Sequence, residues 1–362
     1  MTVVDADAHI NEDVTAWKDL SAKRPHWVGL GHSGGKPVAK IGGKLYPLQE
    51  GPGCGVPVDS SLAPACLPGA LDLDQRLRDM DAEGIDVQVL YGGLVIGVTG
   101  YDDAGLACDV AQAYNDWLLT DVCGRAPERL KGVAVLPLQD VRRSVEEMRR
   151  CVDLGAVAVT VPPLVGRRPL DDPSLGELWE AAESLDVAVG VHSAPGMNLA
   201  MPGAEYFANY AQVHLLSFPL DQMVAFTALA LGGVMDAHPR LRFAFLEAGV
   251  GWVPYFLSRA QEHKEKRAEL LPNLKTDMKE LVARGQCYFS FECEDEFLPT
   301  FIEHLGSDAI VYASDYPHWD SDFPGTVVEA REHAQPFGDE VVRKVLGDNA
   351  SRLYGLPVGA SV

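Results

Sequence analysis

Short apolar runs, rich in branched side chains, recur along the chain and are separated by longer amphipathic stretches. Runs of this kind are typical of buried strands, and their alternation with amphipathic stretches is typical of β–α units. The pattern predicts strands at residues 3–6, 87–91, 132–136, 156–161, 187–192, 242–247, 287–291 and 310–314. Strands that alternate with helices in this number favour a closed (β/α)8 TIM barrel over an open sheet.

The stretches between these runs carry apolar side chains at helical spacing. In residues 141–154, for example, Val145, Met148 and Val152 fall on one face, as expected for a helix that packs on a sheet. The predicted helices lie at residues 73–83, 104–123, 141–154, 174–185, 222–231, 253–269, 296–305 and 327–333. We therefore expect one α/β domain that spans residues 1–362.

Two segments are longer than the connections of a bare barrel. Residues 13–70 follow the first strand, are rich in Gly and Pro, and contain Ile41-Gly42-Gly43-Lys44, which predicts a hairpin turn. Residues 194–221 form a second excursion after the fifth strand. Long connections of this kind are typically lids or binding loops. Both follow the carboxyl ends of strands, so we expect residues 13–70 to be a lid-like insertion over the active site.

The overall charge narrows the range of partners. The formal net charge is −22, which argues against binding to nucleic acid or to an anionic membrane. No apolar run approaches the length of a membrane span, and the N-terminus has no signal-type segment. The 7 cysteines form no Cys-x-x-Cys pair, which favours reduced thiols. We expect a cytoplasmic protein that acts on a small molecule, with a homodimer as one option for its assembly.

Acidic and histidine residues stand at the ends of four of the predicted strands. They are Asp7, His9 and Glu12 near the first strand, His192 at the fifth, Glu247 at the sixth, and Asp315 and His318 after the eighth. Asp5, Asp7 and His9 share one parity on a strand and are therefore expected to point the same way. Each residue alone is compatible with a strand-end cap or a turn. Together, at one end of one barrel, they have the composition of a metal site.

Four further residues are candidates for substrate contact near the predicted mouth of the barrel. They are His214, Trp252, Arg259 and Trp319. Arg259 suits an anionic group, and Trp252 and Trp319 suit stacking on a substrate. Plain packing or a solvated surface is the alternative explanation for each of them.

Two segments carry a resemblance to a known family. Residues 241–246 and 313–318 resemble the amidohydrolase-related family, in particular its branch of metal-dependent decarboxylases of unsaturated and aromatic acids. That family carries a His-x-His or Glu-x-His pair on strand 1, a histidine on strand 5, a catalytic histidine on strand 6 and an aspartate on strand 8. The resemblance assigns the strand 1 pair to Asp7 and His9, the strand 5 ligand to His192 and the strand 8 ligand to Asp315.

The chain departs from that pattern at Glu247, which stands where the decarboxylases have the strand 6 histidine. A carboxylate is a weaker base than imidazole near neutral pH and a better ligand for a hard metal. The carboxylate-rich donor set suits iron or manganese, and two ions rather than one. In Asp7 and Glu247 the chain also resembles the TIM-barrel non-haem diiron monooxygenase group of platensimycin and platencin biosynthesis.

These observations lead to one main expectation and two alternatives. The main expectation is an O2-dependent monooxygenase of antibiotic biosynthesis with two iron ions, which hydroxylates a carboxylic acid or its CoA thioester. The first alternative is a non-oxidative decarboxylase or hydrolase with one manganese or zinc ion and with Glu247 or His318 as the acid/base group. The second is a binding protein on an inactive barrel, against which the intact His192 and Asp315 argue.

Overall fold

The computed structural model describes residues 1–33, 35–55 and 67–357. Its centre is an 8-stranded parallel sheet. In spatial order the strands are β1 (Val4–Ile10), β5 (Val87–Gly92), β6 (Leu130–Val135), β7 (Ala158–Val161), β10 (Ala188–Val191), β11 (Phe243–Phe245), β12 (Cys287–Phe291) and β13 (Ile310–Tyr312). The ends of β1 and β13 meet through backbone hydrogen bonds from Asp315 to Asp7 (3.1 Å) and from His9 to Tyr316 (2.6 Å). The sheet is thus a nearly closed barrel, and the predicted fold class is confirmed.

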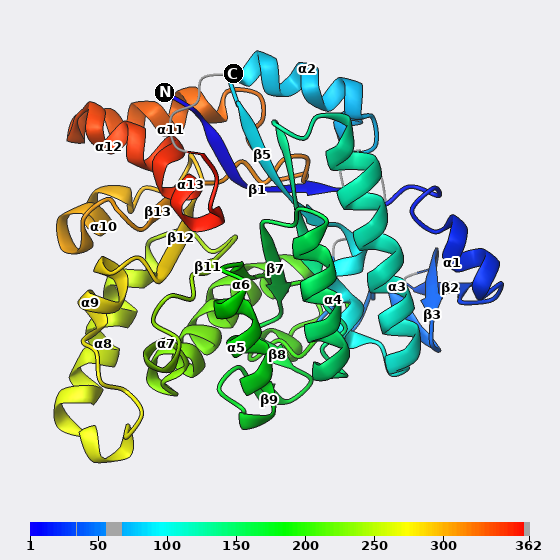
Figure 1. The fold of residues 1–362 in the computed structure, drawn as a ribbon, viewed down its shortest axis with the longest axis horizontal. Helices are drawn as coiled ribbons and strands as arrows, with labels where there is room; N and C mark the ends of the chain where they lie inside the picture. The colour runs from blue at the N-terminus through cyan, green and yellow to red at the C-terminus, as the bar shows by residue number, and fades with distance from the viewer. Residues whose placement is uncertain (34, 56–66, 358–362) are drawn as a thin grey trace.

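Helices surround the barrel (Figure 1). The main ones are α2 (Leu73–Glu83), α3 (Ala104–Asp116), α4 (Val141–Asp153), α5 (Gly176–Ser184), α6 (Tyr210–Phe226), α8 (Trp252–Lys266), α10 (Leu298–Leu305) and α11 (Thr326–Ala334). The shorter ones are α1 (Lys18–Lys23), α7 (Val234–Ala237), α9 (Met278–Ala283), α12 (Asp339–Arg343) and α13 (Asn349–Tyr354). Helix α3 continues into the π-helical segment η3 (Trp117–Val122). The predicted alternation of strands and helices therefore holds around the barrel.

Helix α6 differs from its prediction. It begins at Tyr210, after the cap residue Asn209, and includes Pro219 within the helix, whereas the sequence pattern placed the start at residue 222. With the π-helical segment η7 (Thr227–Leu231) it forms a helix that is long and apolar enough to cross a membrane by length and composition. The prediction that no apolar run approaches that length was therefore wrong. More than half of this helix is buried inside the molecule, as in a core helix of a globular protein.

The interior of the barrel is filled by alanines and valines with a few larger side chains, and the last helix closes its amino end. Alanines at positions 6, 158, 188 and 244 belong to the interior cluster together with Leu353 and Tyr354 of α13. The Tyr354 hydroxyl donates a hydrogen bond to the carbonyl of Ala6 (2.7 Å) and lies 3.0 Å from the Tyr91 hydroxyl. Because α13 fills the amino end, the open mouth of the barrel is at the carboxyl ends of the strands.

The insertion after β1 contains a small antiparallel sheet of β2 (Val28–Ser33), β3 (Lys36–Ile41) and β4 (Lys44–Tyr46). The predicted hairpin turn is confirmed between β3 and β4, where Gly42 and Gly43 have φ values of 56° and 90°. Such angles at both central residues favour glycine. The amide of Leu48 donates to the carbonyl of Gly196 (2.7 Å), so the insertion meets the segment after β10. Of the predicted insertion 13–70, residues 34 and 56–66 lie outside the described residues.

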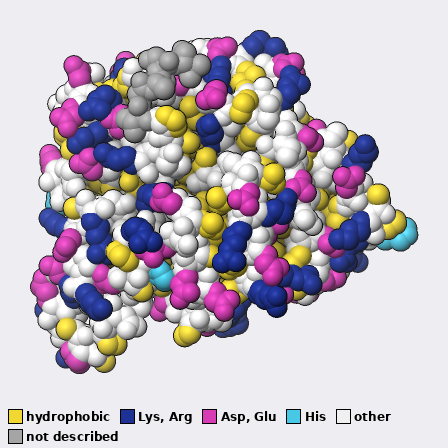
Figure 2. Space-filling model, in the orientation of Figure 1, with side chains coloured by type: hydrophobic (Ala, Val, Ile, Leu, Met, Phe, Trp, Pro, Cys, Tyr) yellow, Lys and Arg dark blue, Asp and Glu magenta, His cyan; other side chains and the backbone are white. Residues whose placement is uncertain are grey.

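Acidic and basic side chains are intermixed on the surface. On the face shown in Figure 2, Lys and Arg are scattered among Asp and Glu rather than gathered in one patch. Some of the basic side chains form ion pairs with acidic ones, as Arg125 does with Asp74 (2.7 Å).

Candidate metal centre

Asp7 and His9 lie at the end of β1, inside the mouth of the barrel, and are 1% and 2% exposed. The His9 Nε2 atom is 3.6 Å from Asp7 Oδ1. The His9 Nδ1 atom is 3.0 Å from the carbonyl oxygen of Gly92. Because a carbonyl can only accept, this contact places the proton on Nδ1 and leaves a free lone pair on Nε2. Orientation of the ring by a carbonyl is typical of histidines that bind metal.

Asp5 does not share the orientation of Asp7 and His9, so that prediction was wrong. The register between β1 and β5 shifts between Asp5 and Ala8, and such an irregularity changes which way successive side chains point. The Asp5 carboxylate instead accepts hydrogen bonds from Gln88 Nε2 (3.0 Å) and from Ser314 Oγ (2.6 Å). Asp5 thus ties β1 to its neighbours β5 and β13 and stays out of the mouth.

His192 and Glu247 bring further donor atoms to the same point. His192 Nε2 is 3.2 Å from His9 Nε2 and 2.9 Å from Glu247 Oε2. The His192 Nδ1 atom lies 2.6 Å from the carbonyl of Ser193, so its Nε2 also carries a lone pair rather than a proton. Two imidazole lone pairs and a carboxylate oxygen thus face one another. A cation between them would turn this repulsion into attraction.

Asp315 and His318 complete the group from the end of β13. Asp315 Oδ1 is 3.5 Å from His9 Nε2, and His318 Nδ1 is 2.8 Å from Asp315 Oδ1. The His318 ring stacks on the His9 ring with centroids 4.1 Å apart. Burial by itself lowers the pKa of His318, but the carboxylates of Asp315 and Glu247 outweigh it and raise the pKa to about 9.

The donor set fits a divalent metal ion. The ligand atoms of Asp7, His9 and His192 lie within 4.8 Å of one another, and so do those of His9, Asp315 and His318. Within the part of the chain that the structure describes, Asp7 Oδ1 is buried and has no hydrogen-bond donor. Burial raises the pKa of Asp7 well above its usual range, and a cation beside it would favour the ionised carboxylate. Nitrogen and carboxylate donors together suit manganese, iron or zinc.

The structure does not bring Glu12 into this group. Its carboxylate accepts hydrogen bonds from the backbone amides of Leu94 (3.2 Å) and Val95 (3.1 Å). These are the first residues of the 3-10 segment η2 (Leu94–Gly100), so Glu12 caps a helix end. We therefore remove Glu12 from the ligand set.

Trp252 and Arg259 do not lie at the mouth either. Trp252 packs between the sheet and the helices, with ring centroids 5.7 Å from Phe289 and 6.3 Å from Phe226. The Arg259 side chain is 52% exposed and its nearest acidic partner is Glu262 on the same helix, at 3.7 Å. Trp252 is therefore explained by packing, and Arg259 by its place on the solvated surface.

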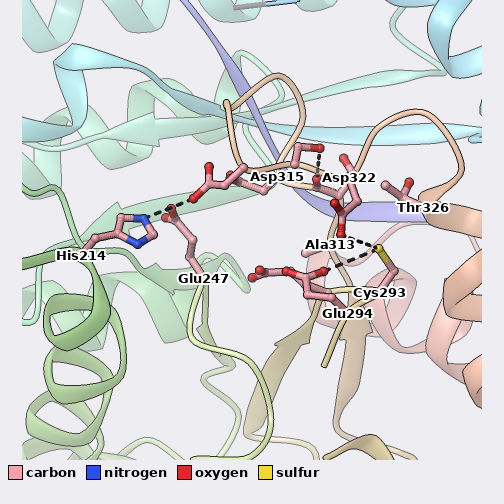
Figure 3. Close-up of a pocket in the computed structure, with 12 residues that line it drawn as sticks. His214, Glu247, Cys293, Glu294, Ala313, Asp315, Asp322 and Thr326 are labelled. Carbon is pink, nitrogen blue, oxygen red and sulfur yellow. Dashed lines mark hydrogen bonds and ion pairs between the residues drawn. The ribbon is translucent and has the colours of Figure 1, made fainter. Parts of the chain in front are cut away.

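A cavity of about 150 Å³ adjoins the candidate metal ligands (Figure 3). It is lined by His214, Glu247, Glu292, Cys293, Glu294, Ala313, Ser314, Asp315, Asp320, Ser321, Asp322 and Thr326. His214 and Glu247 approach from one side and Cys293 and Glu294 from the other. His214 Nε2 is 3.3 Å from Asp320, and the ring of the 43% exposed Trp319 lies 5.9 Å from the His214 ring. Two of the four predicted substrate residues thus lie at or beside the cavity.

Sequence reasoning missed several residues of this cavity. Glu292 directly follows β12, and its buried Oε1 atom has no hydrogen-bond partner within the described ranges. The signal was present, because Glu292 ends an apolar strand just as Glu247 does. Asp320 and Asp322 lie in the loop after β13, where no spacing rule indicates which side chains turn inward.

Comparisons with known proteins place this geometry in a family context. A family model described as Amidohydrolase matches residues 4–356. The chain is 27% identical over 357 residues to the 2-amino-3-carboxymuconate-6-semialdehyde decarboxylase of Dictyostelium discoideum, covering 97% of this chain and 91% of that protein. It is 29% identical over 295 residues to the gamma-resorcylate decarboxylase of Rhizobium radiobacter, covering 78% and 87%.

Solved structures agree in fold. An amidohydrolase from Mycobacterium avium subsp. paratuberculosis K-10 superposes with a TM-score of 0.78 at 23% identity, covering 98% of this chain and 99% of that chain. A dihydroxybenzoic acid decarboxylase from Polaromonas sp. JS666, solved with bound manganese and the inhibitor 2-nitroresorcinol, superposes with a TM-score of 0.69 at 20% identity, covering 98% and 97%.

These findings correct the main functional expectation. The diiron monooxygenase prediction was wrong, because the relatives that align with most of the chain are decarboxylases. O2, CoA and antibiotic biosynthesis had entered only with that prediction, and none of these comparisons supports them or a pair of iron ions. The resemblance to the parent family is confirmed over almost the whole chain: the protein belongs to the amidohydrolase family.

Proposed function

We propose that this protein is a metal-dependent, non-oxidative decarboxylase of a small carboxylic acid. One observation carries the proposal: Asp7, His9, His192 and Asp315 come from three different strand ends and converge on one buried point. The decarboxylase names of the relatives support the reaction type. The manganese in the Polaromonas structure supports one manganese ion as the metal.

The residues divide into two groups by their place around that point. Asp7, His9, His192 and Asp315 would hold the ion, which supplies a Lewis acid that polarises the substrate carboxylate. Glu247 and His318 stand beside them as ionisable side chains that could hold a proton for the reacting carbon. Decarboxylation breaks the bond between that carbon and the carboxylate, releases CO2 and puts a proton in its place. The reaction needs no oxidant.

The size and lining of the cavity bear on the substrate. A cavity of about 150 Å³ suits a single-ring or short-chain acid. The Dictyostelium and Rhizobium relatives are named for an unsaturated semialdehyde acid and for an aromatic acid. We propose that the substrate of this chain belongs to the same two classes and that His214 and Trp319 border it.

The test is turnover of such acids by protein loaded with manganese. The wild type is incubated with 2,6-dihydroxybenzoate and related hydroxybenzoates, and CO2 release is measured in air and under argon. We expect turnover that requires manganese and is equal in both atmospheres. His9→Ala should abolish it. His263→Ala, which alters an exposed histidine on α8, should leave it unchanged.

Two results would overturn the proposal. One is the failure of the wild type to bind manganese or zinc at all. The other is product formation that stops when O2 is removed. The single domain with a lid, the homodimer and the cytoplasmic location remain predictions from the sequence.

A further inference from the structure

Gln222 of α6 contacts the backbone at the ends of β10 and β11, beside the candidate metal centre. Its side chain is fully buried, at 0% exposure. The Nε2 atom donates hydrogen bonds to the carbonyl of Val191 (3.1 Å) and to the carbonyl of Leu246 (2.9 Å). Val191 directly precedes His192, and Leu246 directly precedes Glu247. The side-chain amide of Gln222 therefore links the backbone just before His192 to the backbone just before Glu247.

The contact lies where the strand ladder ends. The regular pairing of β10 and β11 stops at Val191 and Phe245, and the next backbone hydrogen bond, from Leu246 to Val191, is long at 3.4 Å. Both carbonyls belong to fully buried residues, where an unpaired carbonyl costs about 1–3 kcal/mol. The Gln222 amide thus adds a shorter hydrogen bond to the Val191 carbonyl and supplies a donor to the Leu246 carbonyl, which lies beyond the regular strand pairing.

The peptide unit between Leu246 and Glu247 is held at both of its polar atoms. Gln222 binds its carbonyl oxygen (2.9 Å), and the Glu247 amide donates to Ser290 Oγ (2.8 Å). Glu247 itself has a φ of 55°, in the left-handed region that non-glycine residues rarely occupy. Such a conformation persists where surrounding contacts over-determine it. Gln222 and Ser290 are those contacts here.

The same stretch of α6 also fixes the other side of His192. Asp221 Oδ2 accepts a hydrogen bond from Ser193 Oγ (2.8 Å), and Asp221 is 1% exposed. The His192 amide donates to the carbonyl of Val161 (3.1 Å). The neighbours of His192 are therefore both bound to α6, Val191 through its carbonyl and Ser193 through its hydroxyl, while the His192 ring faces Glu247 at 2.9 Å.

We propose that Gln222 is a positioning residue of the metal centre, which sets the separation of His192 and Glu247. This rests on the proposed function only in that His192 holds the ion and Glu247 flanks it. Groups that orient a ligand without touching the metal typically change metal affinity by roughly 10–100-fold when they are removed.

A matched control exists at the other end of the barrel. Gln286 is 1% exposed and also joins backbone carbonyls through one amide, at Met235 (3.0 Å) and His238 (2.8 Å). It directly precedes β12 (Cys287–Phe291) and thus lies at the amino end of that strand, away from the mouth. Gln222→Met and Gln286→Met remove the same kind of buried hydrogen bonds, so both should lower stability towards urea.

The experiment is titration of the metal-free proteins with MnCl2, followed by calorimetry and by the electron paramagnetic resonance spectrum of bound Mn2+. We expect Gln222→Met to weaken manganese binding by about 10–100-fold and to alter the spectrum, and Gln286→Met to do neither. Gln222→Asn keeps the amide on a side chain that is one methylene shorter, so it can reach at most one of the two carbonyls and should give a smaller loss. This second variant decides the question if Gln222→Met does not fold.

Two outcomes count against the inference, and they are distinguishable. If the wild type binds manganese and the Gln222 variants bind it with the affinity and spectrum of Gln286→Met, Gln222 is structural only. If the wild type itself takes up no metal, the proposed function fails and this inference fails with it. A selective loss at Gln222 supports it.

Discussion

Arg76 of α2 is a buried charge beside the metal centre, and its removal gives the sharpest test of how the end of β1 is held. The side chain is 0% exposed. Its guanidinium donates hydrogen bonds to Gly69 O (3.0 Å), Gln88 Oε1 (2.9 Å) and His9 O. Burial lowers the pKa of Arg76 to about 10, so it stays charged at neutral pH. Through Gln88 the network continues to the carboxylate of Asp5 (3.0 Å).

Arg76→Met keeps most of the volume of the side chain and removes the charge and all donors. The three acceptors are uncharged, and a buried acceptor left without its donor costs about 1–3 kcal/mol. Three such acceptors, each near the low end of that range, give the total loss. We therefore expect the free energy of unfolding to fall by about 3–5 kcal/mol. Because one acceptor is the carbonyl of His9, manganese affinity should also fall by roughly 10-fold.

Urea unfolding followed by circular dichroism measures the first effect. The control is Arg125→Met, since Arg125 and its partner Asp74 are 57% and 65% exposed and an exposed pair contributes about 1 kcal/mol at most. If Arg76→Met costs no more than Arg125→Met, the buried guanidinium does not hold the end of β1, and the reasoning is refuted.

Three further predictions follow from the site and the core. His192→Ala should reduce manganese affinity by more than about 100-fold, because the loss of a ligand exceeds the loss of its support; full metal content by mass spectrometry, with normal turnover, would show that His192 is no ligand. Burial alone raises the pKa of Asp236, but hydrogen bonds from Thr276 outweigh it and hold the pKa below its usual value. This stabilisation is present above the unfolded pKa near 4 and is lost as pH falls through the lower folded pKa. Asp236→Asn should therefore destabilise the protein at pH 7 and much less at pH 2–3, and equal losses in urea titrations at both pH values would contradict this. Trp252→Phe should lower stability by about 1–3 kcal/mol with an unchanged KM, and Arg259→Ala should change neither; a raised KM in either variant would return that residue to the substrate site.

The sequence by itself determined the barrel and the end of it at which the candidate metal ligands gather. Buried parallel strands are continuous apolar runs, so their number and order can be read along the chain, and β12 (Cys287–Phe291) has the predicted bounds. The carboxyl ends of parallel strands share one face. For that reason Asp7, His192 and Asp315 could be expected together before any contact was known.

The metal and the reaction could not be predicted from the sequence as the barrel was. Oxygen and nitrogen donors suit iron and manganese alike, so the surplus of carboxylates near Glu247 favoured two irons without excluding one manganese. Only the relatives corrected this. Glu247 still differs from the histidine that the family resemblance led us to expect, and its neighbour His192 at 2.9 Å is a contact that spacing does not reveal.

The tertiary structure alone decided the direction of the remaining side chains. A register shift in β1 turns Asp5 towards Gln88, and the backbone amides of η2 capture Glu12. The rotational setting of α8 buries Trp252 against Phe289 and leaves Arg259 in solvent. In each case the deciding partner is distant in sequence or depends on how a helix is rotated about its axis. Periodicity along the chain indicates which residues share a face of a helix or strand. Long-range packing decides whether that face meets the core, the site or solvent.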